Sequence, residues 1–223
     1  IVLPEADHVI PLLSETAAQL KNFNVSMGYP LKRSSLYSLF VQVFQAQLSR
    51  KEGMYYTKDY LKVLRHPLVK NLRLSGPPVV TRVLVHKLEE ILTGKYETPV
   101  SGMLFVPLSE VEAAGDLYTL AGETLAGMGV VVTNAELRGV LSALHEGLFA
   151  GWERLDNFSG FSGALETFLD LLIRASALSR YPLNLKIAGK MYDIADEFRR
   201  AVFSGERFPA EDLFKIFSEK IER

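Results

Sequence analysis

The chain has 223 residues, of which 48% are hydrophobic and 23% are charged, and its formal net charge is −1. Such a composition is typical of a globular protein that is long enough to bury an extended core. The absence of cysteine excludes disulfide frameworks, thiolate zinc sites and cysteine nucleophiles. No apolar run approaches the roughly 18 residues that a membrane span requires, and the acidic start, which Pro4 interrupts, is unlike a signal peptide. We therefore expect a cytoplasmic protein without membrane contact.

The amino-terminal part is predicted to contain two short strands, near 1–4 and 23–27, and a sharp turn at 28–30. Helical periodicity begins after this turn. The apolar side chains in 34–48 recur at the 3.6-residue spacing of one helical face, which predicts a long amphipathic helix.

Residues 57–65 repeat the helical spacing, and His66 ends it because a residue that precedes proline is pushed out of the helical region. The next helix is predicted to begin at Pro77 and Pro78 and to end at Gly94. These signals predict three helices in the first 94 residues.

Residues 103–106 are predicted to form a third short strand or an extended link. Two helix starts follow, because Ser109 with Glu112 and Thr133 with Glu136 both fit the capping box. In that motif each side chain satisfies a backbone N–H of the first helical turn.

The stretch NFSGFSG at 157–163 is predicted to be a turn. Three helices are predicted after it. The second of them carries Val202 on its apolar face and ends at Ser204 and Gly205, and the last begins near Pro209.

Together these elements predict a mainly α fold, a helical array of about eight helices with two or three short peripheral strands at the amino-terminal end. A lone pair of strands is only marginally stable in water, so the strands are predicted to belong to a neighbouring sheet outside this chain. Residues 1–30 would be a strand and loop fringe of a larger protein, and residues 31–223 its helical domain. The sequence leaves open whether this domain is one lobe or divides into two near 95–108. Ile1, in place of methionine, also favours an excised segment.

Catalytic motifs are weak in this sequence. Lys190 lacks the upstream glycine that a phosphate-binding loop requires. The stretch HEGLF begins like a zinc protease motif, but Phe149 occupies the second histidine position, and we predict a solvent-exposed or capped His145. Ser162 lacks the spacing of a nucleophile elbow and is predicted to lie in a flexible turn. We therefore expect that this segment is not an enzyme and holds no metal ion or other cofactor.

The positive feature is a basic region between residues 32 and 95. Residues 1–96 carry a net charge of +6, whereas residues 97–178 carry −8, and such segregation bears on binding partners. Cations of this region would neutralise phosphates without reading sequence, and neighbouring tyrosines would stack on bases. The alternative is a solvated polar face whose tyrosines pack in the core or at its rim. The candidate nucleic-acid-binding residues are Lys32, Arg33, Arg50, Lys51, Tyr55, Tyr56, Lys58, Lys62, Arg65, Lys70, Arg73, Arg82 and Lys87.

A resemblance to a known family involves the same region. NVSMGYPLKRSSLYSLFVQVFQAQ at 24–47, followed by YYTKDYLKVLRHPLVKNL at 55–72, resembles UvrD-like superfamily I helicases. It is more similar to their relatives among AddB-type and RecC-like helicase–nuclease subunits, a group that includes inactivated helicases and PD-(D/E)XK nuclease family proteins. IVLPEADHVIPLL at 1–13 is similar to the preceding strand and loop in the AddB-like proteins. The resemblance implies that Asn24 to Met27 are a strand of a motor domain, which ends in the turn at 28–31, and that the helix from Ser34 leads into an inserted helical subdomain called 2B.

What the resemblance implies about function is limited to an accessory role. The ATP-binding loop, the magnesium ligands and the nuclease residues would lie elsewhere in a parent protein, so ATP and Mg are expected only there. Pro30 and Leu31 depart from the polar sequence after this turn in active helicases, which implies a motor that has been lost. The expected function is a non-catalytic helical domain of a DNA repair protein that binds DNA without sequence specificity.

An alternative function is a protein-interaction scaffold that docks a partner subunit of a helicase–nuclease complex without touching DNA. The acidic region 97–178 or exposed apolar residues would then form the docking face. A stand-alone helical enzyme is a third interpretation, and it would require a deep polar pocket.

Overall fold

The computed structural model describes residues 34–178 and 182–222. Within these ranges the chain forms ten α-helices, one short 3-10 helix and two strands, which confirms a mainly α fold. The described part holds no helix that is both long and apolar enough to cross a bilayer. The strands predicted at 1–4 and 23–27 and the boundary near residue 30 lie outside the described residues.

The first helix, α2 (Ser35–Leu48), begins where the sequence predicts. The hydroxyl of Ser34 accepts a hydrogen bond from the backbone N–H of Tyr37 at 3.1 Å, which satisfies one donor of the first turn. Helix α2 carries the first apolar stripe into the core, and it forms one wall of the basic cleft described below.

The chain then turns back through α3 (Thr57–Leu64) and the short α4 (Pro67–Lys70). The break between them at His66 is confirmed, since this residue has an extended ψ of 136°. Helix α5 (Pro78–Leu92) also ends as predicted: Gly94 has a φ of +87°, which a glycine adopts without strain.

The two strands pair with each other inside the described chain. Strand β1 (Tyr55–Tyr56) and strand β2 (Phe105–Val106) are antiparallel, with Tyr55 opposite Val106. The strand predicted within 103–106 is therefore confirmed. The prediction that it completes a sheet outside the chain is wrong, because its partner comes from the connection that precedes α3.

Three helices follow: α6 (Leu108–Ala113), α7 (Gly115–Gly127) and α8 (Asn134–Leu148). The capping box at α8 is confirmed, with the Thr133 N–H donating to the Glu136 carboxylate at 2.7 Å. The box predicted at Ser109 is wrong, because α6 begins directly after Pro107 and Ser109 lies within it. The side chain of Glu112, its expected partner, contacts a histidine instead.

The carboxyl-terminal part contains the 3-10 turn η4 (Ala150–Trp152), followed by α9 (Phe158–Ala175), α10 (Pro182–Arg200) and α11 (Ala210–Glu222). The turn predicted at 157–163 is wrong. Its residues from 158 onward begin α9, since the Asn157 amide oxygen accepts from the backbone N–H of Gly160 at 2.7 Å and caps the helix. Val202, predicted on a helix, lies beyond the end of α10 and is fully exposed.

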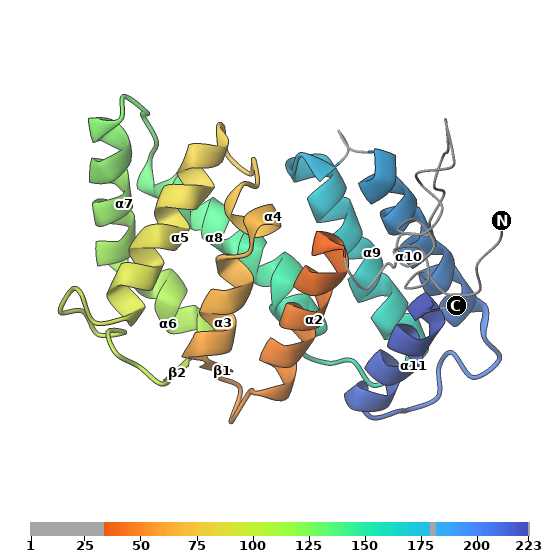
Figure 1. The fold of residues 1–223 in the computed structure, drawn as a ribbon. Coiled ribbons are helices and arrows are strands. Elements are labelled where there is room, and N and C mark those ends of the chain that lie inside the picture. Colours follow the sequence, from red (N-terminus) through yellow and green to blue (C-terminus); the bar gives the residue numbers. More distant parts are fainter. Residues whose placement is uncertain (1–33, 179–181, 223) are drawn as a thin grey trace, which may run out of the picture.

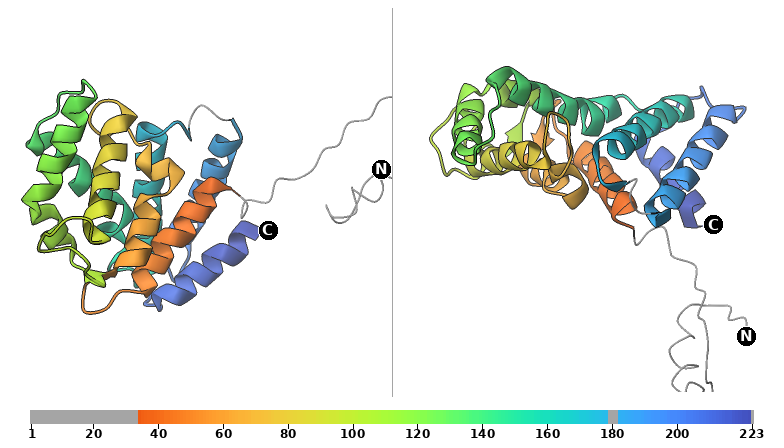
Figure 2. Two further views of the ribbon diagram at one scale, coloured as in Figure 1. Left: turned by 60° about the vertical axis from the view of Figure 1, so that its left-hand side comes forward. Right: turned by 90° about the horizontal axis from the view of Figure 1, so that it is seen from above.

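The helices form two layers. In Figure 1, α7, α5, α3, α2 and α11 follow one another across the molecule, and α8 crosses behind α5 and α3. The view from above in Figure 2 shows α8 and α9 on one side and α5, α4 and α2 on the other. The packing of α2 beside α3 in the front layer is what brings the basic residues of α3 to a cleft.

The buried side chains form one continuous core that extends from Leu36 to Ile221. Phe40 of α2 lies among aromatic rings, with its ring centre 4.6 Å from that of Phe217 and 5.7 Å from that of Trp152. Val100, from the segment where two lobes would divide, belongs to the same core. The apolar packing thus continues through that segment.

Candidate nucleic-acid interface

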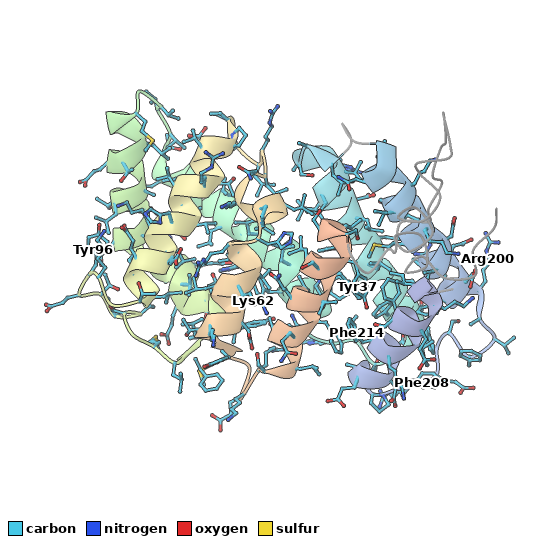
Figure 3. The ribbon with its side chains drawn as sticks, in the orientation of Figure 1. Tyr37, Lys62, Tyr96, Arg200, Phe208 and Phe214 are labelled. Atoms are coloured by element: carbon cyan, nitrogen blue, oxygen red, sulfur yellow. The ribbon has the colours of Figure 1, made fainter. Side chains whose placement is uncertain are left out.

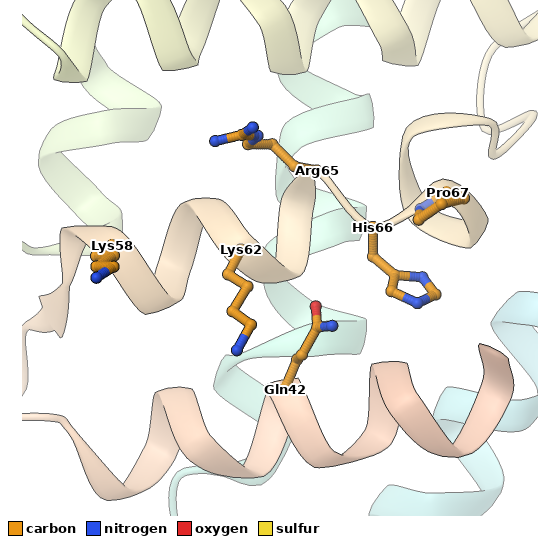
Figure 4. A pocket seen from close by; sticks show the side chains of 6 residues that line it. All are labelled: Gln42, Lys58, Lys62, Arg65, His66 and Pro67. Carbon is orange, nitrogen blue, oxygen red and sulfur yellow. The ribbon is translucent and has the colours of Figure 1, made fainter. Parts of the chain in front are cut away.

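A cleft of about 400 Å³ lies between α2 and the α3–α4 junction. Figure 4 shows its lining, in which Lys62 extends from α3 and Gln42 from α2 into the space between the two helices. Arg65 points away from α2 in the same view. The residues that line the cleft are Gln42, Lys58, Lys62, Arg65, His66 and Pro67.

The cations of the cleft share one face of α3 because of their spacing. Lys58, Lys62 and Arg65 follow one another at intervals of four and three residues, and all three are exposed. The opposite face of α3 is apolar and buried, which fixes the rotation of the helix and keeps the basic face outward. The buried side chains of α3 are Tyr60, Leu61, Val63 and Leu64.

The charge of the cleft is not neutralised by its own lining. Lys58 and Lys62 form no ion pair within the described ranges, and Arg65 pairs with Glu89 at 3.2 Å while its side chain stays 61% exposed. None of the described lining residues carries a carboxylate. Two like charges four residues apart repel each other slightly on a helix, so an anion in the cleft would relieve this repulsion.

His66 contributes a neutral donor to the cleft. Its Nδ1 accepts a hydrogen bond from the backbone N–H of Leu68 at 3.2 Å, which caps α4. Burial lowers the pKa of His66 to about 4, so the ring is neutral at pH 7 and its proton resides on Nε2.

Gln42 supplies a side-chain amide from the opposite wall. Its Nε2 donates weakly to the Ser38 hydroxyl at 3.4 Å. Its Oε1 is buried and has no hydrogen-bond partner among the described residues. Sequence reasoning missed both Gln42 and His66. The His66-Pro67 break indicated a junction there, but nothing in the sequence of α2 distinguishes Gln42 from other polar residues on an amphipathic helix.

Two predicted residues, Arg50 and Tyr55, are engaged inside the protein. Tyr55 is 0% exposed, and its hydroxyl donates to the Glu153 carboxylate at 2.9 Å. The Arg50 guanidinium pairs with Glu153 at 3.1 Å and lies 5.1 Å from the centre of the Tyr55 ring. Burial raises the pKa of Tyr55 well above its ordinary value. The ring of Tyr55 cannot stack on a base. Tyr55 is instead packed in the core, as the alternative interpretation of the basic region expects.

Tyr56 and Lys51 lie at the strand pair, outside the cleft lining. The Tyr56 ring is half-buried and packs 5.6 Å from the centre of the Phe105 ring. Lys51 is exposed, and its ammonium lies 5.3 Å from the centre of the same ring. Lys51 therefore remains accessible to a phosphate, whereas Tyr56 is largely covered.

Lys87 is neutralised by an internal carboxylate. Its Nζ donates to the Glu90 carboxylate at 2.8 Å, and Lys95 also contacts Glu90. Hydrogen bonds from Lys87 and Lys95 lower the pKa of Glu90 to about 2. The Lys87 side chain is only 14% exposed, so we remove it from the candidate surface.

The remaining candidates lie beyond the cleft lining. Arg73 and Arg82 are exposed and Lys70 is half-buried. The Arg82 guanidinium donates to the amide oxygen of Asn71 at 2.7 Å. Lys32 and Arg33 are outside the described residues. The structure thus gathers Lys58, Lys62 and Arg65 at one cleft.

A separate polar network crosses the core. The Tyr60 hydroxyl lies 2.7 Å from Nε2 of His145, whose Nδ1 lies 2.6 Å from the Glu112 carboxylate. Burial lowers the pKa of His145 and raises that of Tyr60, so Tyr60 donates to Nε2 and the Nδ1–H donates to Glu112. The solvent-exposed alternative for His145 is wrong, since it is 2% exposed.

This order of carboxylate, imidazole and hydroxyl is that of a hydrolase relay, but the Tyr60 side chain is 0% exposed and out of reach of a substrate. The network instead joins α6, α8 and α3. Among the described residues no three His, Asp or Glu side chains gather as metal ligands. Ser162, the other motif residue, is buried, and its hydroxyl lies 2.8 Å from the backbone carbonyl oxygens of both Phe158 and Ala195, to one of which it donates.

Comparison with protein-family models, with curated proteins and with solved structures found no match to this chain.

Proposed function

We propose that the basic cleft binds phosphate groups of DNA, and that this helical region is a non-catalytic accessory domain of a helicase–nuclease-like DNA repair protein. The DNA-binding part of the proposal is supported by one observation above all. Three cations, Lys58, Lys62 and Arg65, line a cleft in which no described lining residue is acidic. The repair context rests on the resemblance of residues 24–72 to helicase–nuclease subunits.

The mode of binding follows from which side chains are exposed. Because Tyr55 is buried and Tyr56 is half-buried, aromatic stacking on bases contributes little. Ammonium and guanidinium groups contact phosphates without reading base edges. The proposal is therefore binding to the backbone of duplex DNA without sequence preference, with the Nε2–H of His66 as an additional donor to a phosphate oxygen.

The test compares two double variants of equal charge change. Lys58→Ala/Lys62→Ala removes two cations four residues apart on α3, whereas Lys186→Ala/Lys190→Ala removes two exposed cations of the same spacing on α10. Fluorescence anisotropy with a labelled duplex at low salt should show at least a tenfold loss of affinity for the α3 variant and little change for the α10 control.

Equal losses in both variants would mean that binding follows total charge and not the cleft, which would contradict the proposal. Undetectable binding of the unmodified chain at micromolar concentration would contradict it as well. A second candidate function, docking of a partner protein, is favoured by a different surface, where α10 meets α11.

A further inference from the structure

An apolar groove of about 660 Å³ lies where the loop 201–209 joins α10 to α11. We call it the α10–α11 groove. Figure 3 shows Phe208 in this region, at the end of the molecule opposite to α7. The large apolar side chains that line the groove are Phe158, Phe198, Val202, Phe203, Phe208 and Ile216.

The floor of the groove is an aromatic cluster. The ring of Phe158 meets those of Phe198, Phe203 and Phe208 edge to face, with ring centres 4.7, 5.4 and 5.0 Å away. Edge-to-face contacts of this kind stabilise a fixed arrangement of rings. The groove thus has a preformed floor.

Backbone hydrogen bonds hold the loop wall against α9. The Phe208 N–H donates to the carbonyl of Asp156 at 2.7 Å, and the Ser159 N–H donates to the carbonyl of Ser204 at 3.0 Å. These bonds fix the loop at Ser204 and at Phe208. A ligand would therefore meet a surface that is already ordered, which lowers the entropic cost of binding.

Part of the apolar lining of the groove is open to solvent. Val202 is fully exposed, Phe203 is 46% exposed and Ile216 is 37% exposed. Contiguous exposed apolar residues at the surface of a soluble domain are typical of interaction sites. Because three apolar side chains of the lining are open to solvent, the groove suits a polypeptide segment with several apolar side chains better than a single small molecule.

The charged residues of the groove indicate the sign of the charge that a partner should carry. Lys220 and Glu197 neutralise each other in an ion pair. Glu206, which also lines the groove, has no ion-pair partner within the described part of the chain. The unpaired charge at the groove is negative, and aromatic ring faces also attract cations. A basic residue in the partner is complementary to both.

We propose that the α10–α11 groove docks a basic amphipathic segment of a partner protein. Aromatic or aliphatic side chains of that segment occupy the groove beside Phe203 and Ile216, and a neighbouring lysine or arginine pairs with Glu206. This inference is independent of DNA binding at the cleft. It specifies, for the docking of a partner protein, which surface is used and what kind of segment binds there.

The test uses a phage-displayed library of random peptides of about 16 residues selected on the full chain, followed by anisotropy with the selected peptides. Selected peptides should combine apolar anchors at helical spacing with an adjacent lysine or arginine. Val202→Asp should weaken their binding at least tenfold, and Glu206→Lys at least threefold. Val131→Asp is the matched control, because Val131 is 97% exposed in the α7–α8 connection and lies far from the groove.

Three results would overturn the proposal: a selection that enriches no peptide, peptides that bind the Val202→Asp variant unchanged, and peptides with acidic flanks. A sedimentation experiment that shows self-association abolished by Val202→Asp would also overturn it, since the occupant would then be a second copy of this chain. Lys58→Ala/Lys62→Ala should leave peptide binding unchanged, and Val202→Asp should leave DNA binding unchanged. Each proposal can therefore be contradicted without affecting the other.

Discussion

Replacing Tyr60 by phenylalanine tests whether the buried network through His145 stabilises the fold. The phenylalanine ring fills the same space, so only the hydroxyl is lost, 2.7 Å from Nε2 of His145. His145 is 2% exposed, and bulk solvent does not replace the lost donor. A buried acceptor without a donor costs about 1–3 kcal/mol. We expect the free energy of unfolding to fall by about 2 kcal/mol, which lowers Tm by about 4–8 °C for a chain of this size.

Urea unfolding followed by the fluorescence of Trp152 measures this loss, because Trp152 is the only tryptophan and lies in the core. Tyr118→Phe is the matched control. The hydroxyl of Tyr118 donates to the Glu112 carbonyl at 2.8 Å, but that carbonyl also accepts from Arg138 at 3.0 Å and stays satisfied. The control should therefore lose only about 0.5–1.5 kcal/mol.

Equal losses in the two variants would refute the reasoning, as would a loss below about 0.5 kcal/mol for Tyr60→Phe. Either result would mean that His145 does not depend on Tyr60 for its hydrogen bond. The slope of the unfolding free energy against urea should stay constant, since neither variant changes the surface exposed on unfolding.

Two further predictions concern pH. Burial lowers the pKa of His66 from 6.5 to about 4, so the stability it contributes is full above pH 6.5 and is lost as pH falls toward 4. His66→Asn keeps an acceptor for the Leu68 N–H but removes the titrating ring. Between pH 6.5 and pH 4 the variant should lose about 1–2 kcal/mol less unfolding free energy than the unmodified chain, measured by urea unfolding at both pH values. A pH dependence equal to that of the unmodified chain would contradict the assignment. Hydrogen bonds from Lys87 and Lys95 lower the pKa of Glu90 from 4.5 to about 2, so its contribution is full above pH 4.5 and is lost as pH falls toward 2. Glu90→Gln should destabilise the protein by about 1.5–3 kcal/mol at pH 7 and make its unfolding free energy less dependent on pH between 4.5 and 2. If Glu90→Gln and the unmodified chain unfold at the same temperature at pH 7, this carboxylate does not stabilise the fold.

Helix boundaries that depend on local backbone chemistry could be predicted from the sequence. The breaks at His66 and Gly94 and the capping box at Thr133 are all confirmed, because each depends on residues within a few positions. The predicted box at Ser109 fails because α6 begins directly after Pro107, so that Ser109 lies inside the helix. Glu112 contacts His145 on α8 instead, and no local pattern reveals that contact.

The candidate cleft could be predicted only in part. The spacing of Lys58, Lys62 and Arg65 indicates their common face, since all three belong to one helical segment. Gln42 joins them only because α2 packs beside α3. The burial of Tyr55, which prevents it from stacking on a base, could not be predicted from the sequence either. Its hydroxyl donates to Glu153, which lies far away in the sequence.

The salt dependence of duplex binding tests the central claim most directly. Each phosphate contact on duplex DNA contributes about −0.9 to the slope of log K against log salt concentration. If Lys58, Lys62 and Arg65 each contact one phosphate, the slope should be about −3 for the unmodified chain and about −1 for Lys58→Ala/Lys62→Ala. The Lys186→Ala/Lys190→Ala control should keep the slope of the unmodified chain. A slope that removal of Lys58 and Lys62 leaves unchanged would contradict the account.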